Sequence, residues 1–199
     1  MHEACNRVKI REGNRMTCIV GYVNKITGET VIGADSAGAL DWDIVVRKDT
    51  KIFRKGEFIF GCTSSFRMIQ LLRFSLQMPP VNEKDIFEYM CTDFVDSVRA
   101  CFTTGGYLQK FKDGDEKGGD FLVGYKNRLF NVACDFQVGE AIVGYDAVGS
   151  GARYALGALH SLEDQLLTVE ERVKQALLTA TYFSGGVRPP YTILKTPEL

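Results

Sequence analysis

The sequence predicts an α+β fold in which two stacked antiparallel β-sheets are covered by helices on both outer faces. The expected elements run in the order strands, two helices, strands, two helices and a strand. The strands pair across short turns and are apolar on both faces, as burial between a sheet and a helix layer requires. With 199 residues, of which 45% are hydrophobic and 25% charged, the chain suffices for one substantial core. We expect a single domain over residues 17–199, preceded by an extension, residues 1–16.

Two β-hairpins are expected to open the domain. Strand-forming runs flank a turn at Gly28 within residues 17–36, and another turn at Lys55-Gly56 within residues 50–65. Each run is rich in Val, Ile, Thr or Phe and is bounded by turn residues. The first third of the domain is therefore antiparallel β-structure.

Helical spacing of apolar residues follows the hairpins. Ile69, Leu72 and Leu76 mark one apolar face, which ends at Pro79-Pro80. A longer apolar face, which ends before two glycines, is marked by Phe87, Met90, Phe94, Val98 and Phe102. These two patterns predict two helices against the second hairpin.

The second half repeats the alternation of strands and helices. The expected elements are a hairpin over 121–133, a strand over 140–150, a helix from about Ala152 and a short strand over 191–195. Thr168 and Glu171 form a capping box, which marks the start of the last long helix.

The composition argues against several functional classes. A net charge of −1 does not favour binding to nucleic acid or to an anionic membrane. The six cysteines contain no C-x-x-C pair, so we interpret them as small buried side chains in a reducing cytoplasm. No cofactor or metal is expected, because glycine-rich phosphate loops are absent and the loop around Lys117 lacks the calcium-ligand pattern. No apolar run approaches the length of a membrane span, and without a basic-then-apolar leader we expect neither a membrane span nor a signal peptide.

Polar residues at strand ends form the candidate site. Thr17 begins the first strand, Asp35 closes the second and Lys51 opens the third. Because neighbouring ends of hairpin strands lie side by side, we expect these three to converge at one end of a sheet. Each residue also has a common structural role: Asp35 in a turn, Lys51 as an edge charge, Ser65 and Ser150 as helix N-caps.

Together these motifs resemble the proteasome β-subunit and bacterial HslV-type proteases, which are N-terminal-nucleophile hydrolases. The similarity runs from Thr17 to about Gly186. TCIVGYV matches the mature start with its nucleophilic Thr17, GADS matches the motif of the acid Asp35, and KIFR matches that of the catalytic Lys51. Asp35 and Lys51 both lie slightly farther from Thr17 than in the family, and one short insertion in the first hairpin explains both offsets.

Three further positions carry the resemblance. GCTSS places the backbone amide of the oxyanion hole at Ser65, and VGSGARYALGAL places a site-supporting serine at Ser150. Ser184 matches the serine after the family's terminal helix. The chain departs from the family at Thr181, where proteasome β-subunits usually have an Asp. This departure concerns the proton relay and not the fold.

The resemblance implies amide hydrolysis through an acyl ester on Thr17. A terminal Thr carries its own α-amine, with an ordinary pKa of about 7.7–8.0, which can accept the hydroxyl proton. We expect Lys51, paired with Asp35, to stay charged and to lower the cost of alkoxide character on the Thr17 oxygen. The Ser65 amide would hold the oxyanion of the intermediate.

This chemistry requires a free amine on Thr17, and two routes supply it. The chain cleaves itself before Thr17, or translation begins at Met16 and the initiator Met is removed. The second route is favoured because the preceding Arg-Glu-Gly can be encoded by a purine-rich stretch like a bacterial ribosome-binding site, which the nucleotide sequence tests. Cys18 is a competing nucleophile, but it lies one residue too late to share a skeleton with the amine.

Two other readings remain open. One is a non-catalytic ring subunit of the proteasome α type, with the same fold and a retained extension. The other is a small-amide acylase of the wider N-terminal-nucleophile group. The proteasome-like reading implies polypeptide substrates, a ring-shaped homo-oligomer in the cytoplasm and an ATP-dependent unfoldase partner.

Overall fold

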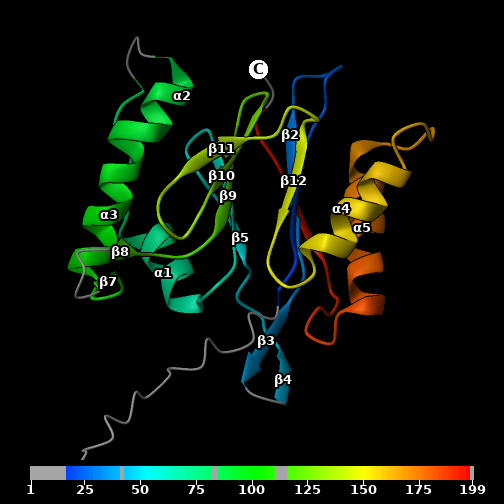
Figure 1. Ribbon diagram of the computed structural model, residues 1–199, viewed down its shortest axis with the longest axis horizontal. Helices are drawn as coiled ribbons and strands as arrows, with labels where there is room; N and C mark the ends of the chain where they lie inside the picture. Colours follow the sequence, from blue (N-terminus) through cyan, green and yellow to red (C-terminus); the bar gives the residue numbers. More distant parts are fainter. Residues whose placement is uncertain (1–16, 41–42, 82–84, 111–115, 198–199) are drawn as a thin grey trace, which may run out of the picture.

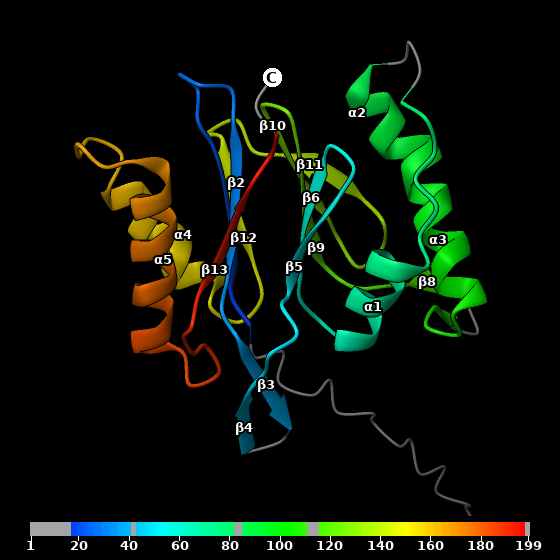
Figure 2. The same ribbon diagram turned by 180° about the vertical axis from the view of Figure 1, so that it is seen from behind.

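Four layers make up the computed structural model, which describes residues 17–40, 43–81, 85–110 and 116–197. Two sheets lie face to face in the middle, with helices α1, α2 and α3 outside one and α4 and α5 outside the other (Figure 1). The view from behind shows the same order of layers (Figure 2). The predicted fold class is confirmed, whereas the expected extension, residues 1–16, lies outside the described residues.

The first sheet has the order β12-β1-β2-β13, and all neighbouring strands are antiparallel. Its strands are Tyr145–Val148 (β12), Ile19–Val23 (β1), Thr30–Ala34 (β2) and Thr192–Lys195 (β13). Ile19 lies opposite Ala34 and, on its other side, opposite Val148. This register places the residues just before β1, just after β2 and just after β12 at the same end of the sheet.

The second sheet has the order β11-β10-β9-β6-β5 and is also antiparallel. Its strands are Val138–Glu140 (β11), Arg128–Val132 (β10), Phe121–Tyr125 (β9), Phe58–Cys62 (β6) and Ile52–Lys55 (β5). The predicted turn at Lys55-Gly56 joins β5 to β6, and the predicted hairpin over 121–133 turns at Lys126-Asn127 between β9 and β10. Gly56 and Lys126 adopt positive φ angles of 58° and 48°, as tight turns require.

A close apolar interface joins the two sheets. The buried residues between them are Ile19, Ile32, Ala34, Ile52, Ile59, Leu122, Leu129 and Val148. A Cβ on Gly61 would lie 2.4 Å from Ile19 and 2.7 Å from Ile32, so only glycine allows β6 to approach the first sheet this closely. This contact fixes the second hairpin against β1 and β2, whose ends carry the candidate site.

The helices match the predicted apolar patterns in most respects. They are Phe66–Phe74 (α1), Ile86–Tyr89 (α2), Val95–Thr104 (α3), Ala152–Ser161 (α4) and Val169–Phe183 (α5). The predicted capping box of α5 is present, with Thr168 and Glu171 exchanging hydrogen bonds. A π-helical turn, Met90–Phe94 (η1), joins α2 to α3. Phe87, predicted on the buried face, is 38% exposed, and Tyr89 is buried in the core instead.

Two short hairpins were not predicted. Ala37–Leu40 (β3) pairs with Asp43–Val46 (β4), and Gln109–Lys110 (β7) pairs with Glu116–Lys117 (β8). The β3-β4 hairpin projects from the end of the sandwich at which β1 begins (Figure 1). Within the described residues, no helix is both long and apolar enough to span a membrane.

Candidate functional site

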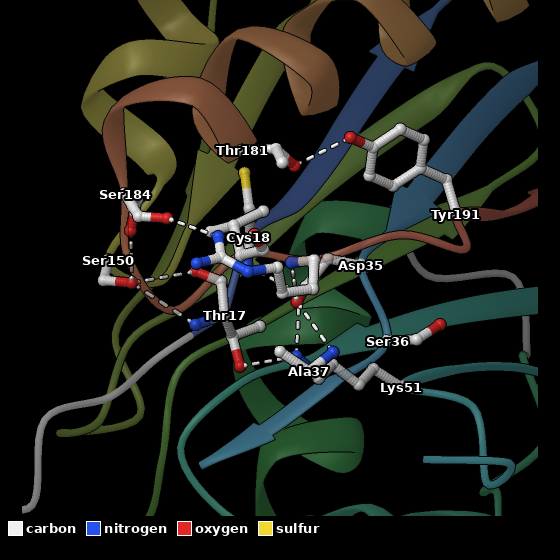
Figure 3. A network of polar contacts seen from close by, with 12 residues as sticks. Thr17, Cys18, Asp35, Ser36, Ala37, Lys51, Ser150, Thr181, Ser184 and Tyr191 are labelled. Atoms are coloured by element: carbon white, nitrogen blue, oxygen red, sulfur yellow. Dashed lines mark hydrogen bonds and ion pairs between the residues drawn. The ribbon is translucent and has the colours of Figure 1, made fainter. Parts of the chain in front are cut away.

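Thr17, Asp35 and Lys51 meet at one end of the sandwich, as expected, but Lys51 comes from the second sheet and not from the sheet of Thr17 and Asp35. Thr17 lies two residues before β1, Asp35 directly follows β2, and Lys51 directly precedes β5. The Lys51 Nζ donates hydrogen bonds to Thr17 Oγ1 at 2.9 Å and to Asp35 Oδ1 at 2.7 Å (Figure 3). All three residues are buried, with 7% or less of their surface exposed. Lys51 is therefore not the solvated edge charge that its position in the sequence commonly indicates.

The Asp35 carboxylate is the centre of this cluster. Besides Lys51, it accepts hydrogen bonds from the backbone N–H groups of Cys18 at 3.0 Å, Ala37 at 2.9 Å and Arg188 at 3.2 Å. Four donors thus compensate a negative charge that would otherwise be costly to bury. The same bonds fix the carboxylate, and with it the position of the Lys51 ammonium.

Burial and charge pairing act on Lys51 in opposite directions. Burial is the larger effect and lowers the pKa of the Lys51 ammonium below its ordinary value, while the Asp35 carboxylate opposes the shift. A buried ion pair of this kind typically adds little net stability. Perturbed ionisable groups with a specific partner are characteristic of functional sites, so the pair is a candidate for chemistry.

The Gly149-Ser150-Gly151 segment encloses the backbone of Thr17. The Ser150 hydroxyl accepts a hydrogen bond from the Thr17 nitrogen at 3.3 Å, and the Gly151 N–H donates to the Thr17 carbonyl at 3.1 Å. Gly149 has a φ of 99°, and a Cβ there would lie 2.3 Å from the Thr17 carbonyl oxygen. The motif therefore needs glycine because the two backbones touch. Ser150 is not the N-cap of α4, a position that Gly151 occupies.

Ser184 extends the network beyond Ser150. Ser184 follows α5 as its C-cap, and its Oγ lies 3.4 Å from the Ser150 Oγ (Figure 3). Thr181, one turn earlier on α5, hydrogen-bonds to the Tyr191 hydroxyl at 2.7 Å. The position at which the resemblance expects a carboxylate is therefore neutral here, and its side chain is bound to a phenol.

No family model matches the chain, and no curated protein matches it either. Solved structures do match. Thiobacillus denitrificans BPH in complex with epoxomicin is 21% identical with a TM-score of 0.75, over 92% of this chain and 100% of that chain. A second structure of Thiobacillus denitrificans BPH is 23% identical with a TM-score of 0.72, over 91% and 98% of the two chains. Eukaryotic HslV from Trypanosoma brucei is 14% identical with a TM-score of 0.63, over 90% and 98%.

The chain has the proteasome β/HslV-like fold. The likeness covers nearly the whole of each compared chain, so the two sheets and their helix layers form one shared architecture. At these identities the likeness is one of fold. The chemistry of the site must be argued from the residues of this chain.

Ser65 is the one predicted site residue that lies apart from this network. Its N–H, expected to face an oxyanion in the proteasome-like fold, donates to the Thr63 carbonyl at 2.7 Å. The intervening Ser64 has a φ of 65°, so the three residues form a tight γ-like turn. The Ser65 hydroxyl caps α1 by accepting from the Arg67 N–H at 3.1 Å, the structural role that its sequence position indicated.

Sequence reasoning missed Arg188. Its N–H binds Asp35, and its carbonyl accepts a hydrogen bond from the Ser36 N–H at 2.9 Å. Its guanidinium Nη1 donates to the carbonyls of Val187 at 2.8 Å and Ser184 at 3.5 Å. The only available signal was a charged residue between two predicted elements, which is common in surface loops.

Cys18 is poorly suited to act as a nucleophile, in agreement with the sequence analysis. Its side chain is buried among the residues between the first sheet and helices α4 and α5. Burial, aided by the negative charge of Asp35, raises the pKa of the Cys18 thiol to about 12. The thiolate form that nucleophilic attack needs is therefore strongly disfavoured near neutral pH. No cluster of possible metal ligands occurs in the part of the chain that the structure describes.

Proposed function

We propose that the protein is a threonine peptidase of the proteasome β/HslV kind. It would hydrolyse peptide bonds through an acyl ester on Thr17 after removal of residues 1–16. The observation that carries the proposal is the 2.9 Å hydrogen bond between the Lys51 Nζ and the Thr17 Oγ1, in a site buried from solvent. The proteasome-like fold supports it, as does the BPH structure in complex with epoxomicin.

The proposed reaction uses both polar groups of Thr17. The hydroxyl oxygen attacks the substrate carbonyl while its proton passes to the free α-amine, directly or through a water molecule. The C–N bond of the substrate then breaks, and the leaving amine takes up the proton. Water attacks the resulting ester in the second half of the reaction and regenerates the hydroxyl.

Lys51 and Ser150 would act on different groups of Thr17 during this reaction. Lys51 stabilises negative charge on the Thr17 oxygen, and Asp35 holds the ammonium in place. Ser150 holds the nitrogen that becomes the α-amine. One well-placed donor to the oxyanion is typically worth about 3–4 kcal/mol of barrier.

The oxyanion donor in this proposal remains the Ser65 amide. Since that amide is bound to the Thr63 carbonyl, the turn at Ser64 must open when substrate arrives. A non-glycine residue at a φ of 65° costs free energy, so opening the turn also relieves strain. The Ser64 hydroxyl, which accepts from the Asp120 N–H at 3.1 Å, anchors the turn in its present form.

The buried Lys51–Asp35 pair favours an enzyme over a purely architectural ring subunit. A structural subunit gains little from burying two charges beside a hydroxyl, because desolvation offsets their attraction. Our proposal extends to polypeptide substrates, a ring-shaped homo-oligomer, an ATP-dependent unfoldase partner and a cytoplasmic location. Sedimentation of the purified protein tests the ring, with a single-chain mass contradicting it.

Peptide hydrolysis by protein that begins at Thr17 tests the proposal directly. A panel of fluorogenic peptides is compared between this protein, Thr17→Ala and the matched Thr17→Ser. We expect Thr17→Ala to lose at least about 1,000-fold in kcat/KM, while Thr17→Ser retains part of the activity because it keeps a hydroxyl. Equal hydrolysis by Thr17→Ala would reject the mechanism. Cleavage of small amides but of no peptide would favour the acylase reading.

A further inference from the structure

A closed ring of polar contacts surrounds Thr17, and Arg188 completes it. From the Thr17 Oγ1 the contacts run to Lys51 at 2.9 Å, Asp35 at 2.7 Å, Arg188 at 3.2 Å, Ser184 at 3.5 Å, Ser150 at 3.4 Å and back to the Thr17 nitrogen at 3.3 Å. Arg188 is the member that joins the charged half of the ring to the serine half. Its N–H contacts Asp35, while its guanidinium contacts the carbonyl of Ser184.

The position of Arg188 is fixed from several directions. Its N–H and carbonyl bind the segment after β2, at Asp35 and Ser36. Its guanidinium turns back toward the C-terminal end of α5, where it binds the carbonyls of Val187 and Ser184. Helix C-termini carry partial negative charge, which favours a cation there. A capping role explains the guanidinium contacts, and the contact with Asp35 is made by the backbone N–H, so it persists when the side chain is changed.

The charged groups around Thr17 come from three elements. Asp35 after β2 and Lys51 before β5 form an ion pair at 2.7 Å, so each offsets part of the other's charge, and the Lys51 Nζ contacts the Thr17 Oγ1 at 2.9 Å. Arg188, after α5, forms no ion pair with an acid in the described residues. The β12-α4 turn contributes only the uncharged Ser150, and the Cys18 thiol is protonated.

The α5 position at which the resemblance expects an acid also carries no charge. Thr181 is neutral, and its hydroxyl is bound to Tyr191. A carboxylate there would favour a protonated amine on Thr17, whereas a guanidinium near Ser184 disfavours it. The Arg188 guanidinium, which contacts the Ser184 carbonyl, is thus a cation without a paired acid among the described residues on this side of the site.

We propose that Arg188 is a positioning residue whose charge keeps the freed α-amine of Thr17 in its neutral, proton-accepting form. The inference rests on the proposed function, because only a terminal Thr17 has this amine. Arg188 contacts Ser184, whose hydroxyl reaches the Ser150 hydroxyl that holds the nitrogen, and it does not touch the substrate. This role would explain why Thr181 stands where the resemblance expects an acid. An acid there would favour the protonated amine, whereas the cation of Arg188 favours the neutral one.

The pH dependence of kcat/KM distinguishes this role from a merely structural one. In protein that begins at Thr17, Arg188→Gln should shift the acid limb to higher pH by on the order of half a unit, so that activity below the limb falls about threefold. Removing a cation eases protonation of the amine, which sets the sign of the shift. Arg188→Lys keeps the charge and should restore the original limb. Thr181→Asp should shift the limb in the same direction as Arg188→Gln.

A second measurement reads the amine without relying on hydrolysis. The rate at which an acylating reagent modifies the Thr17 α-amine, followed by peptide mass against pH, gives the pKa of that amine directly. A higher pKa in Arg188→Gln than in the parent and in Arg188→Lys supports the inference. An unchanged pKa overturns it, even if all variants hydrolyse peptides. If the amine shifts as expected while no variant hydrolyses peptides, the role of Arg188 stands and the proposed function fails.

Discussion

The two sides of Thr17 are built differently. On the hydroxyl side, Lys51 and Asp35 form bonds of 2.7–2.9 Å, and their side chains are 2% exposed or less. On the nitrogen side, the hydroxyls of Ser150 and Ser184 make contacts of 3.3–3.4 Å, and Ser150 is exposed. The hydroxyl side is thus assembled while Thr17 still follows Met16. On the nitrogen side, the peptide nitrogen of Thr17 offers a single N–H, which the Ser150 hydroxyl accepts.

The largest effect on stability and hydrolysis is expected from a substitution of Lys51 on the hydroxyl side. Lys51→Met leaves the Asp35 carboxylate buried without its cation, so we expect it to lower the free energy of unfolding by about 3–5 kcal/mol. Peptide hydrolysis should fall on the order of 1,000-fold, because the charge beside the Thr17 oxygen is lost. Urea unfolding and kcat/KM measure the two effects.

A double variant separates the stability of this pair from its chemistry. Lys51→Met with Asp35→Asn removes both charges, so part of the lost stability should return while hydrolysis stays absent; the return is partial because the Asn amide nitrogen cannot accept the backbone N–H groups that Asp35 binds. Recovered hydrolysis in the double variant would show that the pair serves only the fold.

A smaller loss of hydrolysis is expected from a substitution at Gly149, where the turn before α4 contacts the Thr17 backbone. Gly149→Ala would place a Cβ 2.3 Å from the Thr17 carbonyl oxygen at a φ of 99°. We expect about 100-fold slower hydrolysis from displacement of Thr17, and a loss of about 1–3 kcal/mol in stability. Gly157→Ala on α4 is the matched control, since its Cβ would meet no atom within 4 Å. It should raise stability by about 0.5–1 kcal/mol and leave hydrolysis unchanged.

The hydroxyl side was largely predictable from sequence. Pairing of β1 with β2 brings Thr17 and Asp35 together, whereas Lys51, at the start of β5 in the second sheet, reaches them through the packing of the two sheets. The arrangement of two sheets between two helix layers was likewise predicted from the spacing of apolar residues in the strands and helices. The β3-β4 hairpin was missed because β4 is exposed along its length, so it shows no burial pattern that a sequence can reveal.

The nitrogen side was only partly predictable because it depends on long-range contacts. Ser150 and Ser184 entered the sequence analysis through a resemblance, and nothing in their own neighbourhoods indicated a contact. Arg188 reaches Asp35 across 153 positions of sequence. The occupied amide of Ser65 depends on a positive φ at Ser64, which serine rarely adopts and which no sequence pattern signals.

We expect Ser150→Ala to lower kcat/KM for peptide hydrolysis about tenfold. The variant removes the hydroxyl that holds the Thr17 nitrogen, and one such hydrogen bond is worth about 1–1.5 kcal/mol. Stability should change by less than about 0.5 kcal/mol, because Ser150 is exposed. Ser161→Ala, another exposed serine at the end of α4, controls for the loss of a surface hydroxyl. A loss of hydrolysis as large as that of Lys51→Met would mean that the hydroxyl side and the nitrogen side contribute equally to the reaction.

The smallest effect on hydrolysis is expected from Cys18→Ala. Because burial raises the pKa of this thiol to about 12, it is un-ionised at pH 8 and takes no part in the reaction. Activity should stay within about twofold, with a stability loss of about 1 kcal/mol from the small cavity. Iodoacetamide on the native protein should alkylate the exposed Cys91 and spare Cys18. Rapid alkylation of Cys18 with loss of activity would assign it a role that the structure does not support.

The central claim is that the free amine of Thr17 makes this site an enzyme. Intact-mass spectrometry and peptide hydrolysis, measured on the same samples, test it most directly. Three samples are compared: protein that begins at Thr17, the unmodified full chain, and a full-length Thr17→Ala chain as the control that cannot process itself. We predict hydrolysis only where the mass shows Thr17 as the first residue. Hydrolysis by a full-length chain whose mass still includes residues 1–16 would contradict the account.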